Sequence, residues 1–363
     1  MLLPCKFKLI FSSEASNCVL DFFNDEADMR RIVPFFLLAF LLLGVLYSFI
    51  KLPSNSEPEI HAPYEKPKVL STIRPIQALV LAIGGDLVES EQLIPDTASP
   101  HSYSFRPSDI RRIKRADVIF RIDANFEALL NKTFKSVPKN TPLISLADNS
   151  EIQLLDLKGK HNHTTRFSNN DPHQNHLKAN HNDHGKGHRN KDLHIWVSPH
   201  NMLIMAKAIA TTLSQIDPIN SDKYQNSLTQ FTTKLNTATQ QIEAELASIK
   251  MQPYVVFHNS WQYFLQQFKL QKPTILGFHE ELSAGIKSIK ATRKEIVSKN
   301  IHCVFSDASV KAVRVDVLIE DLNVKTESID ILGLSLPLDV NTSINLIKDM
   351  GQKIKHCLTL TPR

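Results

Sequence analysis

Short apolar runs alternate with amphipathic helical patterns on both sides of one long helical pattern, and this alternation is what most constrains the fold. Parallel strands need a crossover that is usually a helix, so each block predicts a mainly parallel sheet flanked by helices. The expected strands are Val69–Ile73, Val88–Ile94, Val118–Ile122 and Leu143–Leu146, then Tyr254–Phe257, Thr274–Gly277, Cys303–Ser306 and Ser328–Leu332. The expected helices are Pro75–Ile83, Asp109–Ala116 capped by Ser108, Phe126–Leu130, Pro199–Leu213, Trp261–Phe268, Ile286–Lys299, Val313–Leu322 and Asn341–Cys357. The sequence therefore predicts an α/β protein of two lobes with a ligand cleft between them.

The long helical pattern covers residues 219–250 and contains no Gly or Pro after Ile219. Its apolar residues follow a 4-3-4-3 spacing, which forms one stripe along a single helix. They are Tyr224, Leu228, Phe231, Leu235, Ala238, Ile242, Leu246 and Ile249. At 1.5 Å per residue, such a helix is about 45 Å long. We therefore expect a linking helix within residues 216–252, between an N-terminal lobe at 68–215 and a C-terminal lobe at 253–363.

The N-terminal part of the chain carries a targeting signal. The apolar run Ile32–Ile50 follows two arginines, which is typical of a signal peptide, and it is also long enough to serve as a signal anchor. Residues 1–50 are expected to act in this way, with an initiation codon later than residue 1 as an alternative, and residues 51–67 form a Pro-rich linker. We expect the rest of the chain to work in the periplasm, either released or tethered to the inner membrane through residues 32–50.

The composition argues against nucleic-acid binding. The 363 residues include 42% hydrophobic and 22% charged residues, and the formal net charge is +5. This charge is modest, and Lys and Arg form no long run of the kind that contacts phosphates. We therefore expect a globular protein without a nucleic-acid partner.

Two cysteines, Cys303 and Cys357, lie in the part of the chain that is expected outside the cytoplasm. In an oxidising compartment such a pair most simply forms a disulfide. The closed loop would then stabilise the fold by roughly 4 kcal/mol on the chain-entropy description. The alternative is two unpaired buried thiols.

A histidine-rich segment at residues 158–190 interrupts the first block, and we expect it to be a mobile loop because it has no apolar periodicity. Its histidines are His161, His163, His173, His176, His181, His184 and His188. This density of imidazole favours low-affinity collection of a transition metal, and the alternative is a solvated insertion. Residues 151–192 contain five carboxylates and seven Lys or Arg residues. A net positive loop should bind cations less readily, so its contribution should depend strongly on pH.

Three further histidines stand at the ends of expected strands or of this loop. His101 lies in the connection after the strand Val88–Ile94, His194 follows the loop, and His258 directly follows an apolar strand. The carboxyl ends of parallel strands face the ligand crevice, so these imidazoles are candidates for one metal site. Neutral imidazoles suit Zn²⁺, which needs a fourth ligand. Asp330 is the first carboxylate candidate, Asp307 is the second, and a water molecule is the alternative.

Several of these stretches resemble the zinc-binding component of bacterial zinc ABC importers, within the metal-binding solute-binding proteins called cluster A-I or family 9. The matching stretches are Val69-Leu-Ser-Thr-Ile-Arg-Pro75, Ser99-Pro-His-Ser-Tyr-Ser-Phe-Arg-Pro-Ser-Asp109, His194-Ile-Trp-Val-Ser-Pro199, Val256-Phe-His-Asn259 and Cys303-Val-Phe-Ser-Asp307. The resemblance covers about residues 69–358. It implies two α/β lobes linked by a long helix, with a metal between the lobes that is delivered to a membrane permease. It also implies that His101, His194 and His258 bind the metal and that Cys303 and Cys357 form a disulfide.

One departure from the family pattern concerns the residue before the first histidine. Zinc-binding members often carry Glu there, whereas this chain has Pro100. The resemblance therefore implies no carboxylate ligand at that position, and Asp330 or water remains for the fourth place.

These observations together predict a monomeric, non-enzymatic protein that captures Zn²⁺ and delivers it to an ABC permease. One alternative is the same fold binding Mn²⁺ or Fe²⁺, which would favour a site with two carboxylates. Another is a zinc-dependent hydrolase, because three histidines and a water also describe an open catalytic zinc site. Against the hydrolase, the sequence has no HExxH motif and no evident general base beside the three histidines.

Overall fold

The computed structural model describes residues 64–100, 103–135, 137–157, 188, 190–277, 286–307 and 312–359. The expected signal segment, His101 and the loop histidines from His161 to His184 lie outside these residues. Residues Glu65–Arg363 form one compact unit. In the part of the chain that is described, no helix has both the length and the apolar character needed to cross a membrane.

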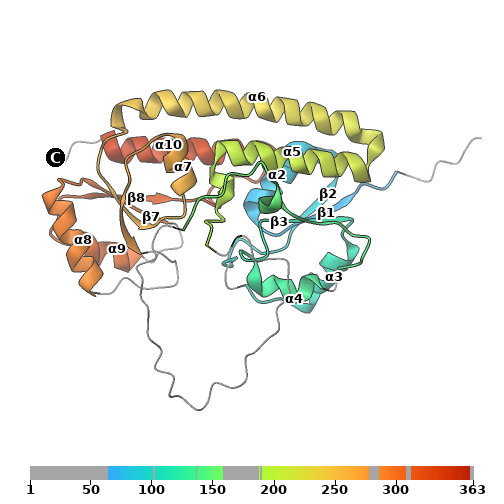
Figure 1. The fold of residues 1–363 in the computed structure, drawn as a ribbon, viewed down its shortest axis with the longest axis horizontal. Coiled ribbons are helices and arrows are strands. Elements are labelled where there is room, and N and C mark those ends of the chain that lie inside the picture. The colour runs from blue at the N-terminus through green and yellow to red at the C-terminus, as the bar shows by residue number, and fades with distance from the viewer. Residues whose placement is uncertain are drawn as a thin grey trace, which may run out of the picture. The chain divides into compact units, whose positions relative to one another are not determined.

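The first lobe is a four-stranded parallel sheet with helices on both faces (Figure 1). Its elements are β1 (Lys68–Ser71), α2 (Arg74–Gly84), β2 (Glu89–Gln92), α3 (Pro107–Arg115), β3 (Val118–Arg121), α4 (Asn131–Phe134), β4 (Leu143–Ser145) and α5 (Pro199–Ile216). The strand order is β2-β1-β3-β4. In both views α2 and α5 lie on one side of the sheet and α3 and α4 on the other. The central strand β3 is therefore covered on both faces, and its Val118, Ile119 and Phe120 are fully buried.

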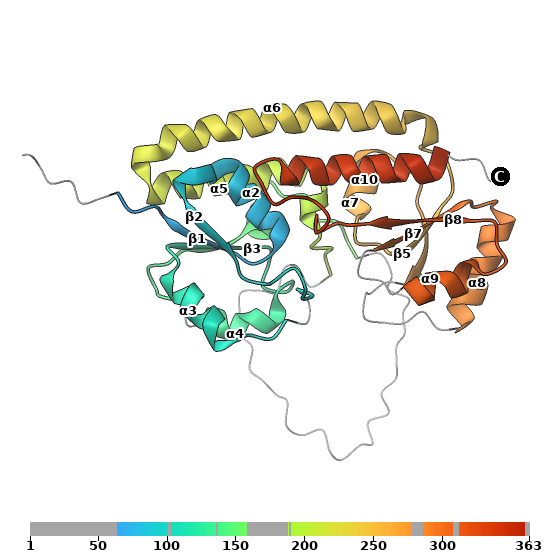
Figure 2. The same cartoon turned by 180° about the vertical axis from the view of Figure 1, so that it is seen from behind.

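The second lobe repeats this topology. Its elements are β5 (Val255–His258), α7 (Gln262–Gln267), β6 (Thr274–Gly277), α8 (Ile286–Ser298), β7 (Cys303–Asp307), α9 (Ala312–Ile319), β8 (Lys325–Ile329) and α10 (Thr342–Thr359). All strand pairs are parallel, and the order β6-β5-β7-β8 corresponds to the order in the first lobe. The helices α8 and α9 lie on one side of this sheet, and α7 and α10 lie on the other (Figure 2).

The expected linking helix is confirmed as α6 (Ser221–Leu246), which at 1.5 Å per residue is about 39 Å long. It packs along α5 and α2 of the first lobe and along α10 (Figure 2). Its buried residues are those of the predicted stripe: Tyr224, Phe231, Leu235, Ala238, Ile242 and Leu246. Gly351 of α10 permits a close approach, because a Cβ there would lie 3.0 Å from Ile242 Cγ2.

Two expected details are wrong at the level of single elements. Strand β8 begins at Lys325, three residues before the expected Ser328, because it is an edge strand whose first four residues are partly or fully exposed. The apolar residues that follow it belong to a loop instead. Helix α3 begins at Pro107 with Arg106 as its N-cap, so Ser108 does not cap it; the Asp109 carboxylate accepts the Arg106 N–H at 2.9 Å.

The loop after β8 crosses back to the first lobe and is fixed there by Arg74. The guanidinium Nε donates to the Gly333 carbonyl at 2.9 Å, and Nη2 donates to the Leu336 carbonyl at 2.6 Å. Nη1 pairs with Asp96 Oδ2 at 2.6 Å. Arg74 is largely buried, so these charge-assisted bonds are shielded from water and hold the two lobes together.

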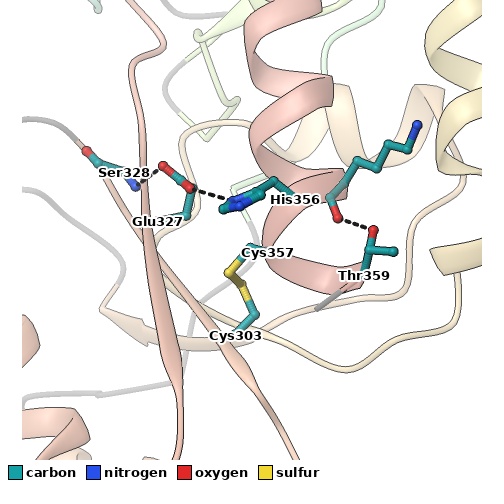
Figure 3. The surroundings of a disulfide bond; sticks show 7 residues. Cys303, Glu327, Ser328, His356, Cys357 and Thr359 are labelled. Carbon is teal, nitrogen blue, oxygen red and sulfur yellow. Dashed lines mark hydrogen bonds and ion pairs between the residues drawn. A yellow bond between two sulfur atoms is a disulfide. The ribbon is translucent and has the colours of Figure 1, made fainter. Parts of the chain in front are cut away.

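The disulfide between Cys303 and Cys357 is present, with a Cα–Cα distance of 5.8 Å (Figure 3). Cys303 begins β7 and Cys357 lies near the end of α10. The bond therefore ties the last helix to the centre of the second sheet. Close to it, His356 of α10 pairs with Glu327 of β8 at 3.4 Å.

We predict that the double variant Cys303→Ser/Cys357→Ser lowers the free energy of unfolding by up to about 4 kcal/mol, because the bond closes a loop with a sequence separation of 54. Urea unfolding followed by circular dichroism measures this. The wild-type protein in reductant is the matched control, because it loses the cross-link without gaining two buried hydroxyl groups. Equal midpoints for the oxidised and reduced wild-type protein would contradict the prediction.

Candidate metal site

His194 is held by a carboxylate two residues before it. It precedes the helical turn Ile195–Val197 and is 9% exposed. Asp192 Oδ1 lies 2.7 Å from His194 Nδ1 and accepts the His194 backbone N–H at 3.0 Å. An ionised carboxylate can only accept, so Nδ1 carries the proton and Nε2 carries the lone pair. This carboxylate–histidine pairing fixes the tautomer and ring direction that a metal ligand needs.

The other oxygen of Asp192 connects this histidine to the second lobe. Asp192 Oδ2 accepts the side-chain amide of Gln262, in α7, at 2.7 Å. The hydroxyl of Tyr263 donates to the Asp192 carbonyl and accepts the Leu155 N–H at 3.0 Å. Burial raises the pKa of the Tyr263 hydroxyl, so it stays protonated and keeps donating.

His258 has the same kind of partner in the second lobe. It ends β5, and Asp307 ends the neighbouring strand β7, so both side chains reach the same edge of the sheet. His258 Nδ1 lies 3.0 Å from Asp307 Oδ2, and the Ser260 hydroxyl donates to Asp307 Oδ1 at 2.9 Å. Asp307 therefore orients an imidazole. As a direct metal ligand, the second choice from the sequence, it would have to share its oxygens between the ion and these two donors.

The imidazoles of His194 and His258 meet between the lobes. Their ring centroids are 5.5 Å apart and the ring planes make an angle of 76°. Phe126 and Trp196 flank His194, with centroid distances of 5.8 and 5.3 Å. The indole Nε1 of Trp196 donates to the Ile331 carbonyl at 2.7 Å, which fixes this aromatic wall to the second lobe. The aromatic rings restrict solvent around the two imidazoles.

A cavity of about 250 Å³ adjoins the rings of Phe126, His194 and Trp196, and His258 is not among its lining residues. His194 and Trp196 line it from the first lobe and Asp307 and Asp330 from the second. Ser99 and Pro100, the two residues before His101, line it as well. His101 itself lies outside the described residues, but its chain neighbours lead to this cavity.

Asp330, the predicted fourth ligand, lines the cavity but holds a turn with both oxygens. Oδ1 accepts the N–H groups of Leu332 and Gly333 at 3.1 and 2.8 Å. Oδ2 accepts the N–H and hydroxyl of Ser335 at 2.7 and 3.0 Å. Gly333 has a φ of 72°, a left-handed conformation that suits glycine in such a turn. A metal bond at Asp330 would compete with these four donors.

Among the predicted loop histidines, His188 is described. Its Nδ1 lies 2.9 Å from Asp123 Oδ2. His188 and Asp123 are not among the residues that line the cavity. The remaining loop histidines, from His161 to His184, lie outside the described residues.

The family described as "Zinc-uptake complex component A periplasmic" matches residues 69–357. This chain belongs to that family. The high-affinity zinc uptake system protein ZnuA of Yersinia pestis is 28% identical over 291 residues, which cover 80% of this chain and 91% of that protein. ZnuA of Brucella suis is 27% identical over 325 residues, which cover 81% and 92%.

Solved structures show the same fold. A zinc-bound deletion mutant of ZnuA matches with a TM-score of 0.66 and 23% identity. The match covers 82% of this chain and 100% of that protein. The Mn-bound periplasmic metal binding protein from Candidatus Liberibacter asiaticus matches with a TM-score of 0.63 and 19% identity, covering 81% and 100%. The expected fold of two α/β lobes with a long helix is therefore confirmed.

Sequence reasoning missed two residues that position the zinc-uptake family's expected site in this chain. Asp192 was counted only as part of the charge of the loop, although its position two residues before His194 is a usable signal. Gln262 gave no signal, because its contact with Asp192 spans 70 residues of sequence. Tyr263 and Trp196 also contribute, through hydrogen bonds to the Asp192 and Ile331 carbonyls.

We predict that Asp307→Asn weakens zinc binding by about 10- to 100-fold, because the carboxylate that orients His258 and increases its basicity is lost. A competitive titration against a fluorescent zinc chelator measures the change in Kd. Asp316→Asn, an exposed aspartate of α9, is the matched control with the same change of charge. An unchanged Kd for Asp307→Asn would show that the orientation of His258 does not depend on this carboxylate.

Proposed function

We propose that this protein captures Zn²⁺ outside the cytoplasmic membrane and delivers it to the permease of an ABC importer. The observation that carries the proposal is the meeting of two imidazoles from different lobes, each fixed by its own buried aspartate. His194 pairs with Asp192 and His258 with Asp307. Membership of the zinc-uptake family and the name of the ZnuA relatives support the same function.

The proposed zinc shell consists of the Nε2 atoms of His194 and His258 together with His101. Ser99 and Pro100 line the cavity, and His101 directly follows them in the sequence. Asp330 or a water molecule completes a near-tetrahedral shell. A water molecule leaves the turn of Asp330 intact, whereas Asp330 would first have to release donors.

The hydrogen bonds that the carboxylates of the cavity already accept favour zinc over Mn²⁺ and Fe²⁺. The alternative metals favour a site in which two carboxylates bind the ion directly. Three carboxylates line the cavity, those of Asp96, Asp307 and Asp330, and each already accepts hydrogen bonds at both oxygens. These bonds take up part of the acceptor capacity of each carboxylate, so the neutral nitrogens are the donors that an ion meets without competing with a hydrogen bond, and they suit Zn²⁺.

A hydrolase would need a general base beside the metal-bound water. The two carboxylates nearest the imidazoles, Asp192 and Asp307, instead accept the Nδ1 protons. A binding protein needs only this arrangement, so capture and release rather than catalysis is the function we infer. We further infer that it acts as a monomer and that residues 32–50 direct it to the periplasm or anchor it there.

The histidine-rich segment is proposed to collect zinc weakly for this site. Any protonated imidazole must lose its proton before it binds the ion, so zinc affinity should fall as the pH falls. The same linkage applies to the proposed cleft histidines.

We predict that His194→Ala and His258→Ala each weaken zinc binding by at least about 100-fold, because a ligand is a larger loss than the 10- to 100-fold cost of an outer partner. His101→Ala should behave in the same way. Competitive zinc titration measures all three variants, and His200→Ala, an exposed histidine of α5, is the control. Loss of tight binding in His200→Ala, or its survival in the other three, would overturn the proposed shell.

We also predict that removal of zinc leaves the separation of the lobes nearly unchanged. Helix α6 packs against both lobes through α5 and α10, and Arg74 fixes the loop after β8 to the first lobe. Spin labels at Lys114→Cys in α3 and Lys290→Cys in α8, both exposed positions, measure the separation by pulsed electron resonance with and without a chelator. An increase of more than a few ångströms would contradict it.

A further inference from the structure

Two aspartates and one histidine converge at the edge of the first sheet. Asp123 follows β3, and Asp148 ends the turn Leu146–Asp148 that follows β4, so neighbouring parallel strands bring both carboxylates to one edge. His188 Nδ1 lies 2.9 Å from Asp123 Oδ2 and 3.6 Å from Asp148 Oδ1. One donor atom from each of the three residues lies within 4.8 Å of the other two.

The position of His188 is set by described contacts. The Lys191 N–H donates to the His188 carbonyl at 2.9 Å. The chain on either side of the histidine-rich segment is paired: Leu157 N–H donates to the Asn190 carbonyl at 2.9 Å, and Asp192 N–H donates to the Leu155 carbonyl at 2.8 Å. His188 therefore stands in a built turn at the C-terminal end of the segment.

Asp123 is the rigid member of the group, with a side chain that is 4% exposed. Its Oδ1 accepts the backbone N–H and side-chain amide of Asn125 at 2.6 and 2.8 Å, which leaves Oδ2 directed at His188. Behind it, the buried Glu127 carboxylate accepts the Asp123 N–H at 3.0 Å. Burial raises the pKa of Glu127, and its hydrogen bonds from Thr72, Ile122 and Asp123 oppose that rise.

An ion-pair latch accounts for only part of this arrangement. One Nδ1–H can donate to one carboxylate, and the 3.6 Å contact with Asp148 is longer than a hydrogen bond. Arg121, two residues before Asp123, donates instead to Ser145 and Asn131, and Lys191 pairs with Asp156. Both carboxylates lie near one ring nitrogen of His188, and a divalent cation in place of its proton would contact all three groups.

The geometry points to a second divalent transition-metal site, formed by Asp123, Asp148 and His188. Tetrahedral zinc with bonds of about 2.0–2.2 Å places its ligand atoms about 3.3 Å apart, close to the two distances seen here. One nitrogen and two oxygens form a donor set that suits Zn²⁺ and similar ions. The side chains of His188 and Asp148 are 22% and 65% exposed, so water completes the shell and the ion exchanges readily.

The second site is close in sequence to the proposed zinc site. His188 is followed, within the same short stretch, by Asp192 and His194, which belong to the proposed zinc site. We infer from this short connection that an ion at His188 is staged for transfer to His194. This staging role rests on the proposed function, whereas the existence of the second site does not.

The test uses the full chain in which the loop histidines from His161 to His184 are replaced by asparagine while His188 is kept. Equilibrium dialysis against micromolar Zn²⁺ and measurement of bound metal should give two ions per chain. Asp148→Asn and His188→Ala should each reduce this to one, with the affinity of the weaker ion lowered at least about tenfold. Glu151→Gln, an exposed carboxylate close by, is the control and should keep both ions.

The two metal sites are separated by a further variant. His258→Ala in the same background should lose the tight ion and keep the weaker one. If the background binds a single ion, or if Asp148→Asn and His188→Ala both retain two, the three residues are an ion-pair latch and the second site is refuted. Because Asp148 and His188 are exposed or partly exposed, thermal unfolding of these variants should match the background and confirm that they fold.

Discussion

The buried carboxylate of Asp192 is the interaction on which the rest of this site depends. It is 1% exposed, and a charge in such a place is tolerated only when donors surround it. Those donors are the backbone and imidazole of His194 on one side and the amide of Gln262 on the other. Since Gln262 belongs to the second lobe, the charge that orients the imidazole also joins the lobes. The direction of the ring and the arrangement of the lobes are therefore coupled.

The remaining carboxylates around the cavity serve similar structural ends. Asp307 orients His258, and Asp330 closes the turn that carries Gly333, whose carbonyl receives Arg74 from the other lobe. The protein thus uses its acidic groups to place nitrogen donors and to fix loops. Because the rings are fixed in this way, an ion that binds as proposed would require little further ordering, and less of the interaction energy would be lost to it.

The eight strands could be predicted because each central strand is a short apolar run bounded by polar residues, and seven of them lie where expected within a few residues. Strand β8 was displaced because an edge strand alternates in exposure; the strand ends at Ile329, and Ile331 and Leu332 belong to the following loop. The rule that ligands gather at the carboxyl ends of parallel strands predicts the position of His258, which ends β5, but not that of His194, which follows the histidine-rich segment. The roles of Asp192 and Gln262 could not be predicted either, since they depend on how segments far apart in sequence come into register.

The paired chain ends beside the histidine-rich segment have a consequence for how this protein can vary. Asp156 and Lys191 form an isolated antiparallel bridge, and their side chains make an ion pair of 2.7 Å. Because Asp156 and Lys191 are paired, the segment between them starts and ends at neighbouring positions in space. Asp192 directly follows Lys191 in the sequence. Insertions or deletions within that segment are thus absorbed before they reach the cleft. The bridge between Asp156 and Lys191 therefore fixes where Asp192 and His194 begin, whatever the number of residues between its two ends.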